Sequence, residues 1–487
     1  MLLLLAAAIL LLALFLFIRK SRYWESRGVP GPKPLPVVGN LGANIIGKKN
    51  AYEITADFYR QYSEYPFVGI FRMGEPCLIL RDPEIIKNVL VKDFSHFINN
   101  DMLVDKKLDP LFGRNPFVEK DEEWKKARQF LTPGFAPAKI KTFFPFVENV
   151  AKSFAKYLKK HEGEALNLKD ICGKYTCDVV ALCAFGLEGN SFEDPNAQFL
   201  KLMRTFVEPD TWQAIKLAIS FYVPFFKLKL MPKSFDDGVI NITKEILKYR
   251  QDNNIKRNDY FESMAQTPSG SLVEIAAHLS GFIVDGYETT SSAMTFIFYE
   301  LARNPKCQQK LREEINSVLE KNNGELSFEI LKDMPYLEAC INETLRLHPP
   351  LAQLTRTCGK SYTLSTISPE FKKLSVKLEP GLSLIIPLLG LHMDPKYFPS
   401  PEEFLPERFL DKSDAHKYVY MPFGTGLRAC LGSRLALLQS KVGTATIIKD
   451  FEISLDEKLQ KPLKYDTMYF LLNPKGGAWI NCRKISQ

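Results

Sequence analysis

The stretch MPFGTGLRACLGSR, residues 421–434, contains one cysteine in a setting suited to binding a metal. Cys430 follows Gly424, Gly426 and Arg428, and the apolar run after it is typical of the start of a buried helix. Backbone amides at a helix start and a nearby guanidinium acidify a thiol, and thiolates are soft metal ligands. Glycines let the backbone pass close to a large flat ligand. We therefore expect a thiolate ligand at Cys430, with Arg428 facing an acidic group of the bound molecule.

Taken alone, a single cysteine is more often a buried and inert side chain. The two close glycines and the arginine favour ligation over that interpretation. A haem, which combines a flat ring with two propionates, fits the pattern.

A second candidate site lies within residues 271–303, the longest helical pattern in the chain. Charged side chains interrupt its apolar residues, so it is not a membrane span. Its centre, GFIVDGYETTSS, combines glycines, hydroxyls and acids that weaken a helix. A distorted turn there would leave a groove for a diatomic ligand, with Glu288 and Thr289 as a proton-handling acid and alcohol. A helix kinked without a functional reason is equally consistent with this segment.

Two further pairs have helical spacing. Trp124 and Arg128 are four residues apart, and Glu343 and Arg346 are one turn apart. A pair such as Trp124 and Arg128 is usually a packed aromatic ring beside a surface cation. A pair such as Glu343 and Arg346 is usually a weak ion pair on the surface. However, Arg408 follows in the segment PERF, and a carboxylate between two guanidiniums is fully hydrogen-bonded even when buried.

Together these residues resemble the conserved motifs of the cytochrome P450 family. The matches are FxxGxRxCxG at Phe423, Gly424, Gly426, Arg428, Cys430 and Gly432; AGx(D/E)T(T/S) at Gly286, Glu288, Thr289 and Thr290; WxxxR at Trp124 and Arg128; ExxR at Glu343 and Arg346; and PERF with Arg408. They occur in the family's order. Asp285 departs from the pattern, since the family usually has Ala or Gly there. Its carboxylate either turns aside into a hydrogen-bonded site or makes the pocket unusually polar.

The resemblance implies a role for each matched residue. Cys430 would be the axial ligand of the iron of haem b, and Glu288 and Thr289 would relay protons. The other cofactor-binding residues would be Trp124, Arg128, Arg356, Phe423, Gly424, Arg428 and Gly432, with Arg356 a weaker match. The structural residues Glu343, Arg346 and Arg408 would hold the cysteine loop in place.

Composition limits the remaining possibilities. The chain has 487 residues, and its net charge of +8 is spread over 64 basic and 56 acidic side chains without a basic tail. Because the positive charge is spread out, nucleic acid is a poor candidate for a partner. An acidic protein or an anionic membrane surface is a better one. Nine cysteines without CxxC pairs fit a reducing compartment.

The N-terminus predicts a membrane anchor. Residues 1–18 carry no charge and are about long enough to span a bilayer, and Arg19 and Lys20 follow directly. A cleaved signal would be shorter and would end in a small-residue site, so an uncleaved anchor is favoured, with the rest in the cytosol. We expect an anchor over 1–20, a linker with a proline-rich hinge over 21–40 and a catalytic domain over 41–487.

The remaining pattern predicts a mainly α fold with a small β-rich portion, in parts of about 65–100 and 350–400. A hairpin is expected over 68–81 around Gly74, an irregular loop with exposed Leu103, Leu111 and Phe112 over 101–120, and strand and turn structure over 470–479. Helices are expected over 51–62, 122–130, most of 140–265, 271–303, 336–348 and from the cysteine loop to 448. Aromatic residues over 221–230 suit a membrane surface, a pocket roof or burial.

The resemblance implies a microsomal monooxygenase in the endoplasmic reticulum membrane that oxidises lipophilic molecules. NADPH would act through a partner reductase, without binding this chain, and cytochrome b5 is a further partner of the family. A basic face on the cysteine side, made of Lys125, Lys126, Lys417, Arg434 and Lys441, would dock the reductase. Two alternatives remain open: a membrane-tethered haem-binding sensor, and a haem-thiolate isomerase that does not need O₂.

Overall fold

The computed structural model describes residues 17–207, 212, 216, 227–257, 259–267, 270–411 and 417–485. Nearly all of the predicted anchor and the aromatic stretch 221–226 lie outside these residues. In the described part of the chain, no helix is both long and apolar enough to cross a bilayer.

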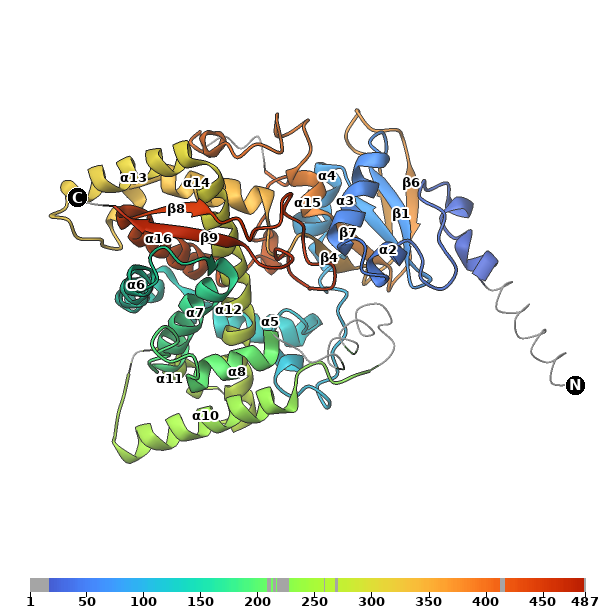
Figure 1. The fold of residues 1–487 in the computed structure, drawn as a ribbon. Coiled ribbons are helices and arrows are strands. Elements are labelled where there is room, and N and C mark those ends of the chain that lie inside the picture. The colour runs from blue at the N-terminus through green and yellow to red at the C-terminus, as the bar shows by residue number, and fades with distance from the viewer. Residues whose placement is uncertain are drawn as a thin grey trace, which may run out of the picture.

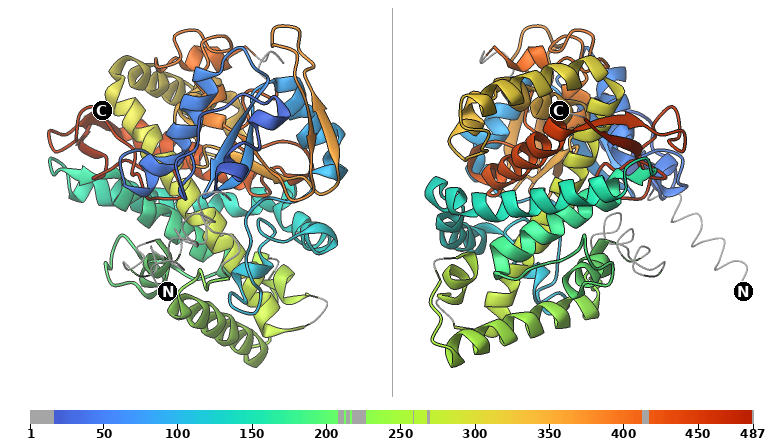
Figure 2. Two further views of the ribbon diagram at one scale, coloured as in Figure 1. Left: turned by 90° about the vertical axis from the view of Figure 1, so that its right-hand side faces the viewer. Right: turned by 60° about the vertical axis from the view of Figure 1, so that its left-hand side comes forward.

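Helices make up most of the described chain, and they surround one long central helix (Figures 1 and 2). The helices are α2 Gly42–Ile45, α3 Ala51–Gln61, α4 Pro83–Lys87, α5 Asp121–Leu131, α6 Pro137–Lys160, α7 Leu168–Val180, α8 Gln198–Val207, α10 Lys233–Asp252, α11 Tyr260–Ala265, α12 Leu272–Arg303, α13 Pro305–Glu320, α14 Pro335–Leu347, α15 Leu388–His392 and α16 Ser433–Asp450. Short helical turns that matter for the site are η4 Phe112–Arg114, η8 Pro406–Phe409 and η10 Gly426–Arg428.

The strands form three small sheets, with orders β1-β2-β7-β4, β3-β9-β8 and β5-β6. Their bounds are β1 Phe67–Arg72, β2 Glu75–Leu80, β3 Leu166–Asn167, β4 Leu354–Thr357, β5 Tyr362–Ser365, β6 Ser375–Leu378, β7 Ser383–Ile386, β8 Phe451–Leu455 and β9 Trp479–Lys484.

The largest sheet joins two distant parts of the sequence. The predicted hairpin is confirmed: β1 pairs antiparallel with β2, Ile70 opposite Cys77. Met73 and Gly74 form the turn, both with positive φ, as a tight hairpin requires. β7 then pairs parallel with β2, and β4 pairs antiparallel with β7. The sheet therefore fixes Arg356 of β4 relative to the N-terminal part of the chain.

Helix α12 is the central element of the helical part. It crosses the molecule in Figure 1 and packs against α7, α10, α14 and α16. Most of its side chains are buried, from Ile275 to Ala302. Burial on nearly every side stabilises this helix, although its glycines and hydroxyl side chains are poor helix formers. Residues 285–289 are therefore held on a rigid support.

Two predictions about local structure are wrong. The helix from 272 to 303 is continuous, so the distorted turn expected near Gly286 is absent from it. Leu111 and Phe112 are buried, because η4 packs against α12, whereas Leu103 of the same irregular loop is exposed as expected. The strand and turn structure expected over 470–479 is confirmed, with turns that lead into β9 at Trp479.

Candidate haem-thiolate site

The cysteine loop connects η10 to α16. The Cys430 N–H donates to the Phe423 carbonyl at 2.8 Å, which closes the loop. Gly424 and Gly426 have φ values of 67° and 72°, where other residues are strained. A Cβ on Gly426 would lie 2.3 Å from the Leu90 carbonyl oxygen, so the backbone approach there needs glycine. Two of the motif's glycines are thus explained by loop geometry.

All nine cysteines lie within the described residues, and Cys430 alone is exposed. Burial among protein atoms nevertheless raises the pKa of its thiol to about 11, although the Gly432 and Ser433 amides and the Arg128 guanidinium lower it. Desolvation is the largest of these effects on the thiol. Arg128 is an arginine whose charge acts on the sulfur.

We infer that Cys430 and Asp285 face one enclosed space between the cysteine loop and α12. Both side chains expose surface, yet desolvation by protein atoms is the largest cause of their raised pKa values. Exposed groups that the protein still desolvates face an enclosed space, not bulk water. The charge of Asp285 also acts on the Cys430 thiol, so the two groups share that space. We call it the central space.

Three arginines gather beside Cys430 from different elements. Arg128 comes from α5, Arg356 from β4 and Arg428 from η10. Burial, together with the charges of Arg356 and Arg128, lowers the pKa of Arg428 to about 9. Burial also lowers the pKa of Arg356 to about 10. The three cations therefore repel one another in a desolvated region.

The surrounding protein satisfies these cations only in part. Arg428 donates to the carbonyls of Ile98, Pro116 and Glu119 at 2.8–2.9 Å, and its guanidinium lies 4.2 Å from the Trp124 ring. These carbonyls provide hydrogen bonds but no negative charge.

The other two guanidiniums keep unused donors. Arg356 donates to Asn100 and Thr355, but its buried Nε has no partner. Within the described residues, the Arg128 guanidinium has no hydrogen-bond acceptor.

A flat ligand with two carboxylates fits this donor set. Asp101 is the acid whose charge acts on Arg356, but it already accepts bonds from Arg72 at 2.9 Å and Ser383 at 2.7 Å. Within the described residues none of the three arginines forms an ion pair, and two propionates would supply one. A thiol on the same side supplies the metal ligand. The residues present therefore fit haem.

The structure also shows a fourth cation that sequence analysis missed. Lys120 lies just before α5 and donates to the Asn100 carbonyl. Burial, together with the charge of Arg428, lowers the pKa of its ammonium to about 8. Nothing in the local sequence distinguished Lys120 from the other lysines near Trp124.

On α12, the predicted acid and alcohol have separate partners. The Thr289 hydroxyl donates to the Asp285 carbonyl at 2.5 Å. Glu288 is buried and forms an ion pair with Lys169 of α7, and it accepts a bond from Asn473 at 3.2 Å. No hydrogen bond joins Glu288 to Thr289 in the described chain. Lys169 is a second residue that sequence analysis missed, because it lies 119 positions away.

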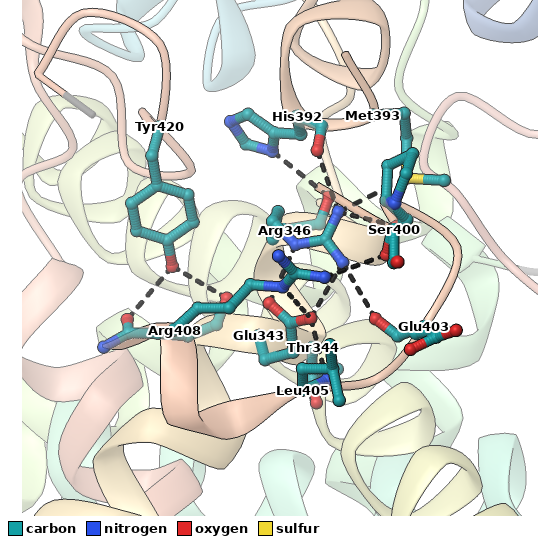
Figure 3. Close-up of polar contacts among 12 residues, drawn as sticks. Glu343, Thr344, Arg346, His392, Met393, Ser400, Glu403, Leu405, Arg408 and Tyr420 are labelled. Atoms are coloured by element: carbon teal, nitrogen blue, oxygen red, sulfur yellow. Dashed lines mark hydrogen bonds and ion pairs between the residues drawn. The ribbon is translucent and has the colours of Figure 1, made fainter. Parts of the chain in front are cut away.

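The predicted Glu343–Arg346–Arg408 cluster is present, and Figure 3 shows it. Glu343 and Arg346 are fully buried on α14 and form two hydrogen bonds of 2.8 Å. Arg408 of η8 donates to the same carboxylate at 3.3 Å, and the Leu405 N–H donates at 3.0 Å. Every oxygen of the buried carboxylate is therefore paired.

His392, which sequence analysis missed, connects this cluster to the cysteine loop. Arg346 donates to the His392 carbonyl at 2.9 Å, and the imidazole Nδ1 lies 3.3 Å from the Arg346 carbonyl (Figure 3). The other ring nitrogen, Nε2, accepts the Met421 N–H at 3.1 Å. Burial, together with the Arg346 charge, lowers the pKa of His392 to about 3, so the ring is neutral. One neutral tautomer satisfies both bonds, with the proton on Nδ1.

The comparison with protein-family models gives one assignment for nearly the whole chain. The cytochrome P450 model matches residues 29–481. This chain belongs to the cytochrome P450 family.

Similar proteins from insects cover this P450 from end to end. It is 35% identical to probable cytochrome P450 6a23 of Drosophila melanogaster, over 100% of both chains. It is 34% identical to cytochrome P450 6j1 of Blattella germanica, over 98% of this chain and 96% of the relative. The identity to cytochrome P450 6a2 of Drosophila melanogaster is 34%, over 98% of each. The chain is accordingly a P450 monooxygenase with the mainly helical fold of the family, which implies a haem-thiolate cofactor.

The basic face predicted on this P450 is smaller than expected. Lys441 forms an ion pair with Glu338 at 2.7 Å, and its side chain is mostly buried. Lys125 pairs with Glu122 one turn away, at 2.5 Å. Three predicted cations remain exposed without a described ion pair: Lys126, Lys417 and Arg434.

Proposed function

We propose that this P450 inserts one atom of O₂ into a lipophilic small molecule, with electrons from NADPH delivered by a partner reductase. The observation that carries the proposal is the cluster Arg128, Arg356 and Arg428, which forms no ion pair within the described residues and lies beside the exposed thiol of Cys430. Haem, when bound, supplies the iron-centred oxidation chemistry that side chains lack.

In this proposal Cys430 is the axial ligand of the iron. The Phe423 carbonyl and the turn at Gly424 hold its backbone, and the Gly432 N–H points toward the sulfur. Amide donors at a thiolate stabilise its charge, so they favour the ligating form. The loop thus positions the sulfur and also sets its electron density.

The propionates would be held by Arg128, Arg356 and Arg428. Trp124, which lies beside Arg428, would be a further hydrogen-bond donor to them. The Trp124 ring stacks on Arg428 and is buried, and no acceptor for its indole N–H occurs in the described residues. Bidentate guanidiniums and an indole N–H are suited to carboxylates.

Proton handling would begin at Glu288. Its ion-pair partner Lys169 has a side chain that is 27% exposed, so this pair connects the buried carboxylate to the protein surface. The second carboxylate oxygen of Glu288 is buried and accepts no hydrogen bond from the described residues. The Thr289 hydroxyl is held by α12 at the edge of the central space, where its oxygen can accept a hydrogen bond.

The placement in the cell is also a proposal. Residues 1–20 would anchor the protein in the endoplasmic reticulum membrane, 21–40 would be the linker and hinge, and 41–487 the cytosolic catalytic domain. The exposed cations Lys126, Lys417 and Arg434 would meet the acidic surface of the reductase.

Carbon monoxide difference spectra test the haem ligand. The wild type, Cys430→Ser and Cys307→Ser are each purified and reduced, carbon monoxide is added, and the spectrum is recorded. Cys307 is the matched control, because it is half-buried and outside the loop. The proposal expects the thiolate spectrum to be lost in Cys430→Ser alone. An unchanged spectrum in Cys430→Ser would refute the ligand assignment.

Turnover separates the alternatives. With reductase present, a monooxygenase consumes NADPH when a lipophilic substrate is added. Haem binding without turnover would indicate a sensor, and turnover without NADPH would indicate an isomerase. Either result would overturn the proposed reaction.

A further inference from the structure

Asp285 presents a carboxylate to the central space. It lies on α12, its side chain is exposed, and burial by protein atoms raises the pKa of the carboxyl group to about 6. A carboxylate that is desolvated and still exposes surface is available to a ligand.

Asn115 fixes the position of this carboxylate. Its Nδ2 donates to both carboxylate oxygens, at 3.2 and 3.1 Å. Asn115 is itself buried, and its Oδ1 accepts the Phe117 N–H at 2.7 Å, so the amide cannot swing away. The Asp285 carboxylate is therefore held by hydrogen bonds from Asn115, and it also remains open to the central space.

The hydrogen bonds leave most of the carboxylate's capacity unused. An ionised carboxyl group has about four acceptor positions, and one amide nitrogen shared between two oxygens fills only part of them. Among the residues that the structure describes, none forms an ion pair with Asp285. Glu288, one turn further along α12, differs from Asp285 because Lys169 forms an ion pair with it.

The titratable groups that face Asp285 do not neutralise it. The charge of Asp285 helps to raise the pKa values of the Tyr260 hydroxyl and the Cys430 thiol. Neither group carries a positive charge in any protonation state. A metal ion is not indicated either, because no group of three His, Cys, Asp or Glu side chains suited to a metal occurs in the described chain.

We propose that Asp285 recognises substrates that carry a basic nitrogen on an apolar body, and that the protonated amine pairs with this carboxylate. The inference rests on the proposed function and names the substrate class of that site. An ammonium or substituted ammonium supplies both the missing charge and the missing donors. The apolar body would lie in the part of the central space that the haem leaves open.

The first test compares two ligands of the same shape. N-benzylpiperidine is protonated near neutral pH, and benzylcyclohexane replaces its nitrogen with carbon. Equilibrium dialysis on the haem-loaded protein gives a dissociation constant for each ligand. The readout is the ratio of the two constants, which a general change in the pocket would leave unaltered.

Asp285→Asn should shift that ratio against the amine by roughly tenfold or more, because the buried cation loses its counter-charge. Asn115→Ser is the second variant, which keeps the carboxylate but releases it, and it should shift the ratio in the same direction by less. An unchanged ratio in Asp285→Asn would overturn the proposal, and so would an equal loss of both ligands.

The second test needs no variant. N-benzyl-N-methylpiperidinium carries a permanent charge, so only the protein titrates. Its affinity should fall by about tenfold from neutral pH to about one unit below the Asp285 pKa of about 6, while that of benzylcyclohexane stays constant. Constant affinity for both ligands would overturn the proposal. A wild-type preparation without the thiolate carbon monoxide spectrum would instead count against the proposed function.

Discussion

Replacing Glu343 with Gln should destabilise the fold and release haem. The substitution keeps the shape of the side chain but removes the charge that holds one buried and one partly buried guanidinium. Glu343 accepts two bonds of 2.8 Å from Arg346, one of 3.3 Å from Arg408 and one of 3.0 Å from the Leu405 N–H. The three bonds from the arginines join opposite charges, and Arg346 has no exposure to water.

The expected cost is about 3–5 kcal/mol, the usual range for breaking a buried ion pair. For a chain of this length the entropy of unfolding is about 1 kcal/mol/K, so the melting temperature should fall by only about 3–5 °C. The loss of haem should be larger than this shift suggests. His392 passes any displacement of Arg346 to Met421, at the start of the cysteine loop.

Thermal melting of the holoprotein and its carbon monoxide spectrum measure the two effects. Arg346→Lys and Arg408→Lys form a matched pair that keeps the charge at each position. Arg346 also donates to the carbonyls of His392, Pro401 and Glu403, whereas the side chain of Arg408 is 12% exposed. Arg346→Lys should therefore be the more damaging change. Equal melting of these two variants, or wild-type behaviour of Glu343→Gln, would refute the reasoning.

Three further predictions concern the loop, acid stability and proton supply. Gly426→Ala should abolish the thiolate spectrum, since its Cβ would clash with a backbone carbonyl, whereas Gly432→Ala, whose nearest contact is at 3.8 Å, should retain it. Because burial lowers the pKa of His392 to about 3, protonation favours the unfolded chain, and stability should decline by about 2 kcal/mol as pH falls from about 6.5 to 5. Denaturant melts of His392→Gln should lose that slope; an identical slope would contradict this. Lys169→Met leaves the Glu288 carboxylate buried and unpaired, so coupled turnover should fall and peroxide release should rise; unchanged coupling would remove Lys169 from the proton path.

Much of the candidate site could be predicted from short spacings in the sequence. The glycines and arginine before Cys430 indicated a ligand loop, and the loop's positive φ values agree with that interpretation. Glu343 and Arg346, one turn apart on a helix, do share one face and do pair. These residues are close in the sequence, so helix and turn geometry alone determines their contacts.

The contacts that sequence analysis missed join distant segments. Asn115 meets Asp285 across 170 positions, and His392 meets Met421 only after α15 and the loops have packed. No local pattern specifies such a partner. The continuity of α12 at Gly286 is a similar case, since packing on several sides outweighs the weak helix propensity of its residues.

The distribution of sulfur in the fold has a practical consequence. Of the nine cysteines, all of which the structure describes, seven are buried, Cys307 is half-buried and Cys430 alone is exposed. In protein that lacks haem, a thiol-specific label small enough to enter the central space should therefore react mainly at Cys430, slowly because burial raises the pKa of its thiol, and coordination of that sulfur to iron should block the reaction. Counting labelled thiols by mass would report how many molecules in a preparation hold their cofactor, without any substrate or electron donor.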